Sequence, residues 1–300
     1  MIYDNSYLSL RSTNLIKILM NRTNFFSITF IFLLAIISFA SFKPLNDGGA
    51  EQIKVLMLTN FGVIKIKLYN ETPRHRDNFV KLIKAHYYDS LLFHRVIQNF
   101  MIQGGDPDSK RAAADSILGN GGPDYTIPAE FNQKLFHKKG VIAAARDGDL
   151  DNPLQASSGS QFYIVQGKVY NESELKKQAM RITKMKLFNE IINRSENKSL
   201  LEIYKRVAKA NIPDSVKFVN DSIDKQLKIE LPAYPAYTFS EEQIKAYTTV
   251  GGTPHLDGSY TVFGEVYDGF EVIDDIAKEK TGRNNRPIKD VRIISISIIP

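Results

Sequence analysis

The chain of 300 residues contains no cysteine. This absence excludes disulfide bridges, thiolate zinc sites, a cysteine nucleophile and an N-terminal cysteine that could carry a lipid. The five histidines are not spaced as metal ligands, so we predict no metal site. Stability must come from packing, and a composition of 43% hydrophobic and 11% aromatic residues can support a sizeable core.

The sequence also lacks the patterns of nucleic-acid-binding and phosphate-binding proteins. The net charge is +6, but 33 acidic residues nearly balance 39 basic ones and no basic block is interleaved with aromatics, so we predict no nucleic-acid binding. The glycine-rich stretch 119–122 has neither the lysine nor the Ser/Thr of a phosphate loop and is predicted to form a turn. The acidic stretch 147–158 begins like a calcium loop, but Asn152 and Ser158 stand where glycine and a bidentate glutamate belong, which favours a solvated loop.

The N-terminal segment has the layout of an export signal. Three basic residues precede the apolar run 25–42, which closes on small residues. The run is also long enough to span a bilayer as an uncleaved anchor. We therefore expect residues 1–43 to be a signal peptide or a membrane anchor and residues 44–52 to be a linker. The remainder is expected outside the cytoplasm, as a periplasmic or secreted domain or one held at the membrane by residues 25–42.

From residue 53 the pattern changes to short strands. Two apolar, partly alternating runs between residues 55 and 69 flank an Asn-Phe-Gly turn and predict a β-hairpin. Thr72 and Pro73 then begin a helix that places Phe79, Leu82 and Ile83 on one face. Further strand patterns lie at 91–106, 140–145, 160–167, 261–266 and 291–299, with a short helix at 270–278. Many short strands with few helices predict a mainly β barrel or sandwich.

Residues 168–248 interrupt this rhythm with helical spacing. Asn171 and Glu174 form a capping-box pattern at the start of a long amphipathic helix. Further helices are predicted at 199–210, at 214–227 and after Ser240, which has Gln243 three residues on. We therefore predict one domain over residues 53–300 that is interrupted by a helical insertion at 168–248.

Four stretches carry a family resemblance: "FHRVIQNFMIQGGD", "GVIAAAR", "SSGSQFYI" and "HLDGSYTVFGEV". In this order they resemble the successive active-site blocks of the cyclophilins, the peptidyl-prolyl cis/trans isomerases. The resemblance covers residues from about 53 to 166 and from about 249 to 300. It implies a closed eight-stranded antiparallel β-barrel capped by two helices, no cofactor, and proline-containing polypeptides as clients. We expect a monomer.

The chemistry of this family explains why Arg95 lies in an apolar run. An X-Pro amide rotates over a barrier of about 18 to 20 kcal/mol because its C–N bond has partial double-bond character. A cation beside the prolyl nitrogen can favour the twisted amide by donating to the lone pair that rotation frees. The resemblance assigns this catalytic role to Arg95, whose guanidinium stays charged when partly desolvated. A structural ion pair on an edge strand is the alternative.

The resemblance also implies the other site residues. An apolar floor for the proline ring would come from Phe100, Met101, Tyr163 and Leu256, although each could equally be a core residue. Gln103 is the second residue expected to act in catalysis, by hydrogen-bonding the substrate backbone. The remaining substrate-binding residues would be Ala145 and Arg146 through their main chain, Gln161 as an orienting residue, and His255 and Tyr260 on the site wall.

The sequence departs from the best-known family pattern at four of these positions. Tyr163 stands where phenylalanine is usual, His255 where tryptophan is usual, Tyr260 where histidine is usual, and Arg146 where asparagine is usual. None of these changes removes the Arg95 cation, so isomerase activity stays the expected function. Two alternatives remain: a peptide-binding chaperone without catalysis, and a membrane-anchored scaffold that acts through the helical insertion.

Overall fold

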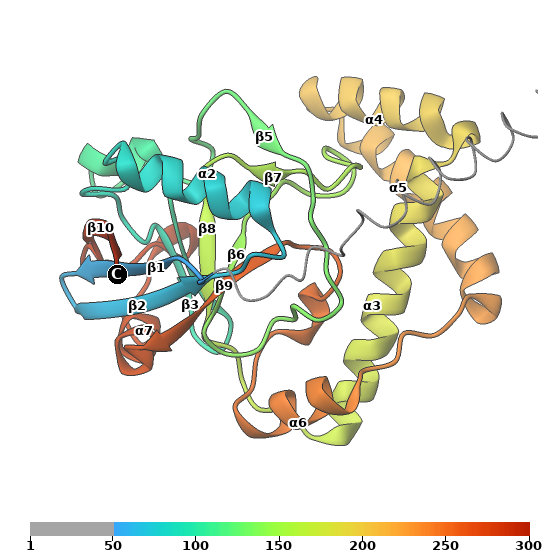
Figure 1. The fold of residues 1–300 in the computed structure, drawn as a ribbon. Coiled ribbons are helices and arrows are strands. Elements are labelled where there is room, and N and C mark those ends of the chain that lie inside the picture. Colours follow the sequence, from blue (N-terminus) through green and yellow to red (C-terminus); the bar gives the residue numbers. More distant parts are fainter. Residues whose placement is uncertain (1–50) are drawn as a thin grey trace, which may run out of the picture. The chain divides into compact units, whose positions relative to one another are not determined.

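An eight-stranded antiparallel sheet is the centre of the fold. The structure, a computed structural model, describes residues 51–300, and Figure 1 shows the curled sheet with the helices around it. The strands run in the order β10-β1-β2-β9-β6-β8-β4-β3. Their bounds are β1 Lys54–Thr59, β2 Gly62–Leu68, β3 Arg95–Ile97, β4 Met101–Gly104, β6 Val141–Ala144, β8 Phe162–Val165, β9 Val262–Asp268 and β10 Ile293–Ile299. A separate small ladder joins β5 (Thr126–Ile127) to β7 (Ser157–Ser158).

The sheet is an open half-barrel and not the closed barrel that we expected. Strands β3 and β10 end the sheet and do not pair with each other as strands. β3 has only three residues, whereas β10 has seven. The chain just before β3 lies beside β10 instead: Phe93 N–H donates to Val291 O at 2.9 Å, and Ile293 N–H donates to Leu91 O at 2.8 Å. The family fold is confirmed with this correction.

The strand pattern at 91–106 proves to be a hairpin. β3 and β4 pair so that Arg95 faces Gln103 across the ladder and Ile97 faces Met101. Asn99 sits in the turn between them with a φ of 62°, a left-handed conformation that asparagine tolerates. The hairpin therefore places two predicted site residues opposite each other.

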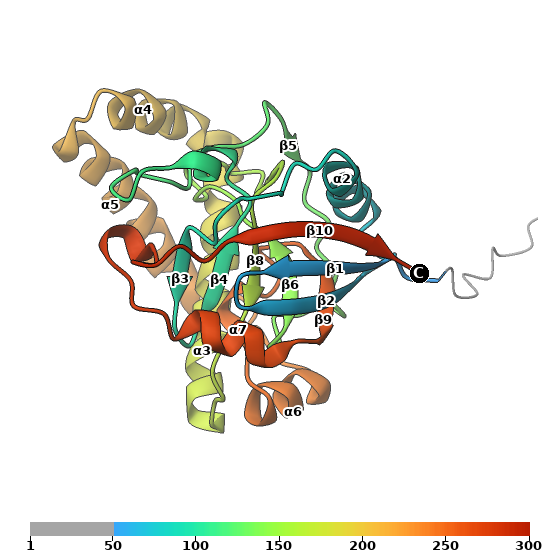
Figure 2. The same cartoon turned by 90° about the vertical axis from the view of Figure 1, so that its left-hand side faces the viewer.

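Two helices bury their apolar faces in the core beneath the sheet. α2 (Pro73–Lys84) buries Phe79, Leu82 and Ile83, as the sequence pattern predicts. α7 (Phe270–Ala277) contributes residues to the same cluster. Figure 2 shows β10, β1 and β2 between these two helices. Short 3-10 helices complete the described chain at Pro107–Arg111, Ser195–Asn197, Leu231–Ala233, Pro254–Leu256 and Arg283–Asn285.

The insertion consists of four α-helices, α3 (Glu172–Asn193), α4 (Lys198–Lys209), α5 (Pro213–Glu230) and α6 (Glu241–Thr249). Both predicted capping boxes form, at the start of α3 and at the start of α6. The C-terminal half of α3 packs with α4 and α5 around an apolar cluster that includes Ile191, Val219 and Ile223. The insertion thus has a core of its own at its outer end.

The two ends of the insertion share a different core with the barrel. Tyr170, Leu175 and Tyr247 pack with Phe136, which lies in the loop before β6, and Tyr247 is fully buried. The insertion is therefore not a detachable arm at its base, because its first and last turns complete the packing of a barrel loop.

No helix of residues 51–300 combines the length and the apolar character that a membrane span requires. The predicted signal peptide or anchor at residues 1–43 lies outside the described residues.

Candidate functional site

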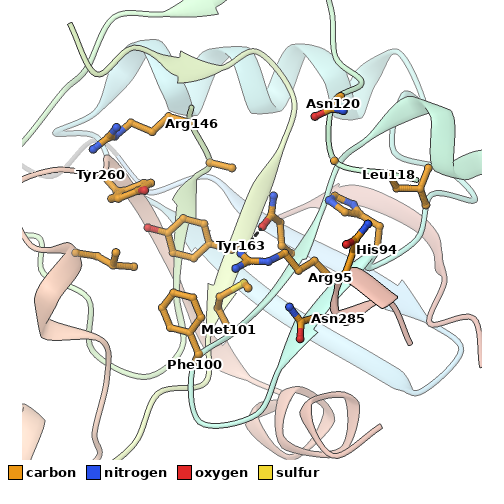
Figure 3. A pocket seen from close by; sticks show the side chains of 15 residues that line it. His94, Arg95, Phe100, Met101, Leu118, Asn120, Arg146, Tyr163, Tyr260 and Asn285 are labelled. Carbon is orange, nitrogen blue, oxygen red and sulfur yellow. Dashed lines mark hydrogen bonds between the residues drawn. The ribbon is translucent and has the colours of Figure 1, made fainter. Parts of the chain in front are cut away.

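A pocket of about 440 Å³ opens beside β3, β4 and β8. Figure 3 shows Arg95 in its middle, with Phe100 and Met101 on one side and Tyr163 and Tyr260 along the wall. All predicted site residues line it except Gln161 and His255, namely Arg95, Phe100, Met101, Gln103, Ala145, Arg146, Tyr163, Leu256 and Tyr260. Residues that are up to 165 positions apart in the sequence thus meet at one place, from Arg95 to Tyr260.

A chain of side-chain hydrogen bonds holds the Arg95 guanidinium. Its Nη1 donates to Gln103 Oε1 at 3.1 Å, and Gln103 Nε2 donates to Gln161 Oε1 at 3.0 Å. Gln161 Nε2 in turn donates to the carbonyl oxygens of Gly119 and Gly121, at 2.9 and 2.8 Å. Gln161 therefore does not line this pocket and contacts Arg95 only through Gln103, so its orienting role stays a prediction.

Arg95 is a cation that has no carboxylate partner within residues 51–300. Among residues 51–300, none of its nitrogens lies within 4.0 Å of an acidic oxygen. Partial burial lowers the pKa of Arg95 from its ordinary value, but an arginine remains charged at neutral pH. The alternative of a structural ion pair does not apply within the described chain, and donor capacity of the guanidinium is left for a ligand.

The floor of the pocket is apolar and firmly packed. Met101, Tyr163 and Leu256 are 2%, 4% and 7% exposed, and they belong to a cluster separate from the main core. Phe100 is fixed through its carbonyl oxygen, which accepts from the main-chain N–H groups of Gln166 and Gly167 at 3.1 and 2.9 Å. A compact apolar ring such as that of proline fits such a surface.

His255 does not line this pocket, in contrast to its predicted place on the site wall. Its ring stacks against Phe100, with centroids 5.5 Å apart and planes at 25°, and it lines a neighbouring hollow. Burial and the nearby Arg181 cation lower the pKa of His255 to about 4. A neutral imidazole thus supports Phe100 from beside the pocket, because the short 3-10 helix at 254–256 turns Leu256 and His255 to different sides.

The main chain at 145–146 offers one anchor where two were expected. Ala145 N–H already donates to Gln161 O at 3.0 Å, and Ala145 O accepts from Ser158 N–H at 2.8 Å. The N–H and C=O groups of Arg146 make no hydrogen bond within the described residues. The main chain of Arg146 is thus the available partner for a peptide backbone.

The side chain of Arg146 builds a wall that the sequence did not reveal. Its guanidinium carbon lies 4.4 Å from the centre of the Tyr260 ring, and Nη1 pairs with Asp149 Oδ1 at 2.7 Å. Tyr260 in turn meets Tyr163 edge to face, with centroids 5.9 Å apart. The side chains at the two departures, 146 and 260, therefore contact each other favourably, since a cation stacks well on a tyrosine ring. Asp149 of the acidic stretch is occupied by this pair.

His94 lines the pocket as well. Four other lining residues escaped the sequence prediction, namely Leu118, Asn120, Asn284 and Asn285. Asn120 could have been found from its glycine-rich loop. Asn284 and Asn285 come from a C-terminal loop that no motif marks, although both have a positive φ of 58° and 59°. Within residues 51–300, no group of three His, Asp or Glu side chains could hold a metal ion.

Comparisons with known proteins show the family of the chain. The sequence model of the family "Cyclophilin type peptidyl-prolyl cis-trans isomerase/CLD" matches residues 54–220 and 241–298, so the match runs into the insertion. A Staphylococcus haemolyticus protein with the name peptidyl-prolyl cis-trans isomerase is 32% identical to this chain over 257 residues. The match covers 85% of this chain and 94% of that protein. One from Staphylococcus aureus strain USA300 is 32% identical over 261 residues, or 86% and 98% of the two chains.

Among solved structures, a cyclophilin type peptidyl-prolyl cis-trans isomerase of Cryptosporidium parvum is similar to this chain with a TM-score of 0.49 and 20% identity. It covers 83% of this chain and 99% of its own. A second structure of that protein, in the presence of the dipeptide Ala-Pro, has a TM-score of 0.48.

The buried His94 predicts a loss of stability in acid. Its side chain is 3% exposed, neither ring nitrogen has a partner among the described residues, and burial lowers its pKa from 6.5 to about 4. At pH values between these two pKa values the unfolded chain binds more protons than the folded one, so the free energy of unfolding falls as the pH falls. Between pH 8 and pH 4.5 this group should cost roughly 2 to 3 kcal/mol.

We expect His94→Leu to remove this acid-dependent loss from the free energy of unfolding, measured by urea unfolding at pH 8 and at pH 4.5. His86→Asn is the matched control, because His86 is exposed and asparagine tolerates its φ of 53°. The control should follow the wild type. Equal losses in wild type and His94→Leu would show that His94 is charged in the folded protein or is unimportant for acid sensitivity.

Proposed function

The chain belongs to the cyclophilin-type peptidyl-prolyl cis-trans isomerases, and we propose that it accelerates X-Pro isomerisation in exported or unfolded proteins, with Arg95 stabilising the twisted amide. The observation that carries this proposal is the unpaired Arg95 cation above an apolar floor. An acidic partner would neutralise the charge that the reaction needs, whereas the neutral Gln103 holds the guanidinium and leaves its charge available.

The pocket can act on the amide without a covalent step. The proline ring rests on Met101, Tyr163 and Leu256, and the main chain of Arg146 holds the peptide beside it. As the C–N bond twists, the prolyl nitrogen loses conjugation and its lone pair becomes an acceptor. The Arg95 guanidinium donates to that lone pair, so its hydrogen bond is stronger in the transition state than in either planar amide. No proton is transferred.

The role of Gln103 follows from its two side-chain contacts. Its oxygen accepts from Arg95 and its nitrogen donates to Gln161. We assign it the task of orienting Arg95 in addition to contacting the substrate backbone. The amide keeps one further N–H and one further lone pair for a peptide.

Removing the Arg95 side chain tests this mechanism. We expect Arg95→Ala to lower kcat/KM in a protease-coupled assay on a short X-Pro peptide by about a hundredfold or more, since one donor in the transition state contributes about this much. Unfolding in urea should change little, because the guanidinium is not part of the core. Arg95→Lys keeps the charge but loses the forked geometry, so its kcat/KM should lie between those of Arg95→Ala and the wild type.

Equal activity of Arg95→Ala and wild type would overturn the mechanism. If affinity for an X-Pro peptide fell as far as turnover, the guanidinium would be a ground-state contact. These two results separate the proposed role of Arg95 from simple peptide binding.

Export is the second part of the proposal, and it rests on the basic residues and the apolar run 25–42. Leu33→Arg with Leu34→Arg should place charges in the middle of that run and keep the protein in the cytoplasm of a bacterial host. Leu154→Arg, on an exposed side chain, is the matched control. Cell fractionation with mass measurement of the intact chain separates a cleaved soluble form from a membrane-held one, and full-length wild type in the cytoplasm would contradict export.

A second candidate function is client holding by the insertion, in addition to catalysis. A groove of about 830 Å³ lies between α3, the segment 234–240 and the barrel loop 131–136. Its wall includes Asp257 and Gly258, while Leu256 and Tyr260 of the same loop line the catalytic pocket. The occupant that this arrangement favours is an extended segment of the polypeptide whose proline occupies the pocket.

Point substitutions test this better than removal of residues 168–248, because Tyr247 and Tyr170 complete the barrel packing. Phe131, which lines the groove and is 39% exposed, is the residue to change. Phe131→Ala should slow proline-limited refolding of a whole unfolded protein several times more than it slows tetrapeptide turnover. Phe218→Ala, on an exposed side chain of α5 outside the groove, is the control. Equal effects on both substrates would argue against client holding.

The alternatives without catalysis are not favoured. A passive peptide-binding module or a scaffold would have no need for the Arg95 cation, and the chain belongs to an isomerase family.

A further inference from the structure

A buried hydrogen-bond network begins at the floor of the catalytic pocket. The Tyr163 hydroxyl lies 3.0 Å from His137 Nε2, and His137 Nδ1 lies 2.9 Å from Asp257 Oδ1. His137 and Asp257 are 0% and 4% exposed. The main-chain N–H of His137 also donates to Asp257 Oδ1 at 2.8 Å. The Asp257 carboxylate thus holds His137 at two points, its imidazole and its main-chain N–H.

The network continues into the last helix of the insertion. Asp257 Oδ2 accepts from the Tyr247 hydroxyl at 2.7 Å and from Gln243 Nε2 at 3.2 Å. Both donors lie on α6 and are 0% and 6% exposed. Three elements that are far apart in the sequence are therefore joined by polar contacts away from solvent: β8, the loop before β6, and α6.

The donors and acceptors fix the direction of each bond. A carboxylate only accepts, so His137 Nδ1 donates to Asp257, and in the neutral imidazole that this leaves Nε2 is the acceptor for the Tyr163 hydroxyl. Burial raises the pKa of Tyr163 well above its ordinary value, so the phenol keeps the proton that it donates. The hydroxyl of Tyr163, which stands where the family usually has phenylalanine, thus anchors a ring that forms part of the proline-binding floor.

The backbone around this network leaves little space for it to shift. An added Cβ at Gly252 would lie 2.2 Å from His137 O and 2.6 Å from the Tyr247 ring. Tyr170 N–H, at the start of the insertion, donates to Tyr247 O at 2.9 Å. The insertion therefore enters and leaves the barrel at the same place, beside α6 and the His137–Asp257 pair.

We propose that Tyr163, His137, Asp257 and Tyr247 form a positioning network through which helix α6 of the insertion sets the tilt of the Tyr163 ring and thereby the rate of isomerisation. The inference rests on the proposed function, because its effect is measured on turnover. Tyr163 touches the substrate, whereas His137, Asp257 and Tyr247 act through it. A displacement of α6 reaches the pocket floor through two tyrosine hydroxyls and one imidazole-carboxylate pair.

A double-mutant cycle on the full chain tests the coupling. Tyr247→Phe removes only the hydroxyl that reaches Asp257, at a position outside the pocket, and should lower kcat/KM on a tetrapeptide about two- to fivefold, mainly through kcat. Tyr163→Phe should have an effect of similar size. The double variant should be no worse than either single variant, because each change breaks the same chain of contacts.

Tyr170→Phe is the matched control. Tyr170 packs in the same cluster as Tyr247, and its hydroxyl makes no hydrogen bond among residues 51–300. This variant should keep the turnover of the wild type. The ring carbon resonances of Tyr163, followed by NMR, should shift in Tyr247→Phe and stay in place in Tyr170→Phe, which gives a readout independent of activity.

The outcomes separate this inference from the proposed function. If the wild type is active and Tyr247→Phe has the same turnover, the positioning network alone is overturned. Additive losses in the double variant would have the same consequence. A loss of melting temperature in Tyr247→Phe with unchanged kcat/KM and unchanged Tyr163 resonances would reduce the network to a structural role. A wild type without isomerase activity would overturn the proposed function, while the Tyr163 resonances would still test the network.

Discussion

The site depends on holding a partly buried cation without neutralising it. A carboxylate beside Arg95 would stabilise the guanidinium strongly but would also take up its charge and its donors. The chain uses neutral amides instead: Gln103 contacts the guanidinium, and Gln161 ties Gln103 to the carbonyl oxygens of Gly119 and Gly121. Each of these hydrogen bonds is weaker than an ion pair, so a chain of several is needed to hold the guanidinium in place. The pairing of β3 with β4 and of β4 with β8 brings them together, since it aligns Arg95 with Gln103 and Gln103 with Tyr163.

A second set of contacts forms the aromatic wall. Arg146 is neutralised by Asp149 and stacks on Tyr260, in contrast to Arg95. Two arginines of the same pocket thus have opposite surroundings. The paired Arg146 supports an aromatic ring, whereas Arg95 has no carboxylate partner among residues 51–300. The difference in pairing, more than the residue type, separates a guanidinium that is engaged within the protein from one that keeps donors for a ligand.

The insertion has two parts with different relations to the barrel. Its outer helices pack around their own cluster, which includes Ile191, Val219 and Ile223. Its base, at Tyr170 and Tyr247, completes the core of a barrel loop and reaches the pocket floor through buried polar groups. Buried hydrogen bonds of this kind resist displacement because an unpaired donor or acceptor is costly away from water. The base is therefore held firmly to the barrel, while the outer part contacts it through Asn189 and Asn193, which donate to Pro153 O at 3.0 and 3.1 Å.

The sequence alone determined most of the longer secondary elements and the residues of the motif around Arg95. Periodicity and capping patterns predicted the β1–β2 hairpin, α2 and both capped helices of the insertion, because these signals depend on residues close together in the chain. The motif around Arg95 and Gln103 could be recognised because both residues lie within one short stretch.

Only the tertiary structure decided which way the remaining side chains face and what they touch. In the structure the sheet is open between β3 and β10, and the His255 ring stacks against Phe100. The Arg146 guanidinium lies over the Tyr260 ring. The tertiary structure also joins His137 to Asp257, which are 120 residues apart. Sequence patterns report local periodicity, whereas these contacts depend on how distant segments pack against each other. No local signal marks them for that reason.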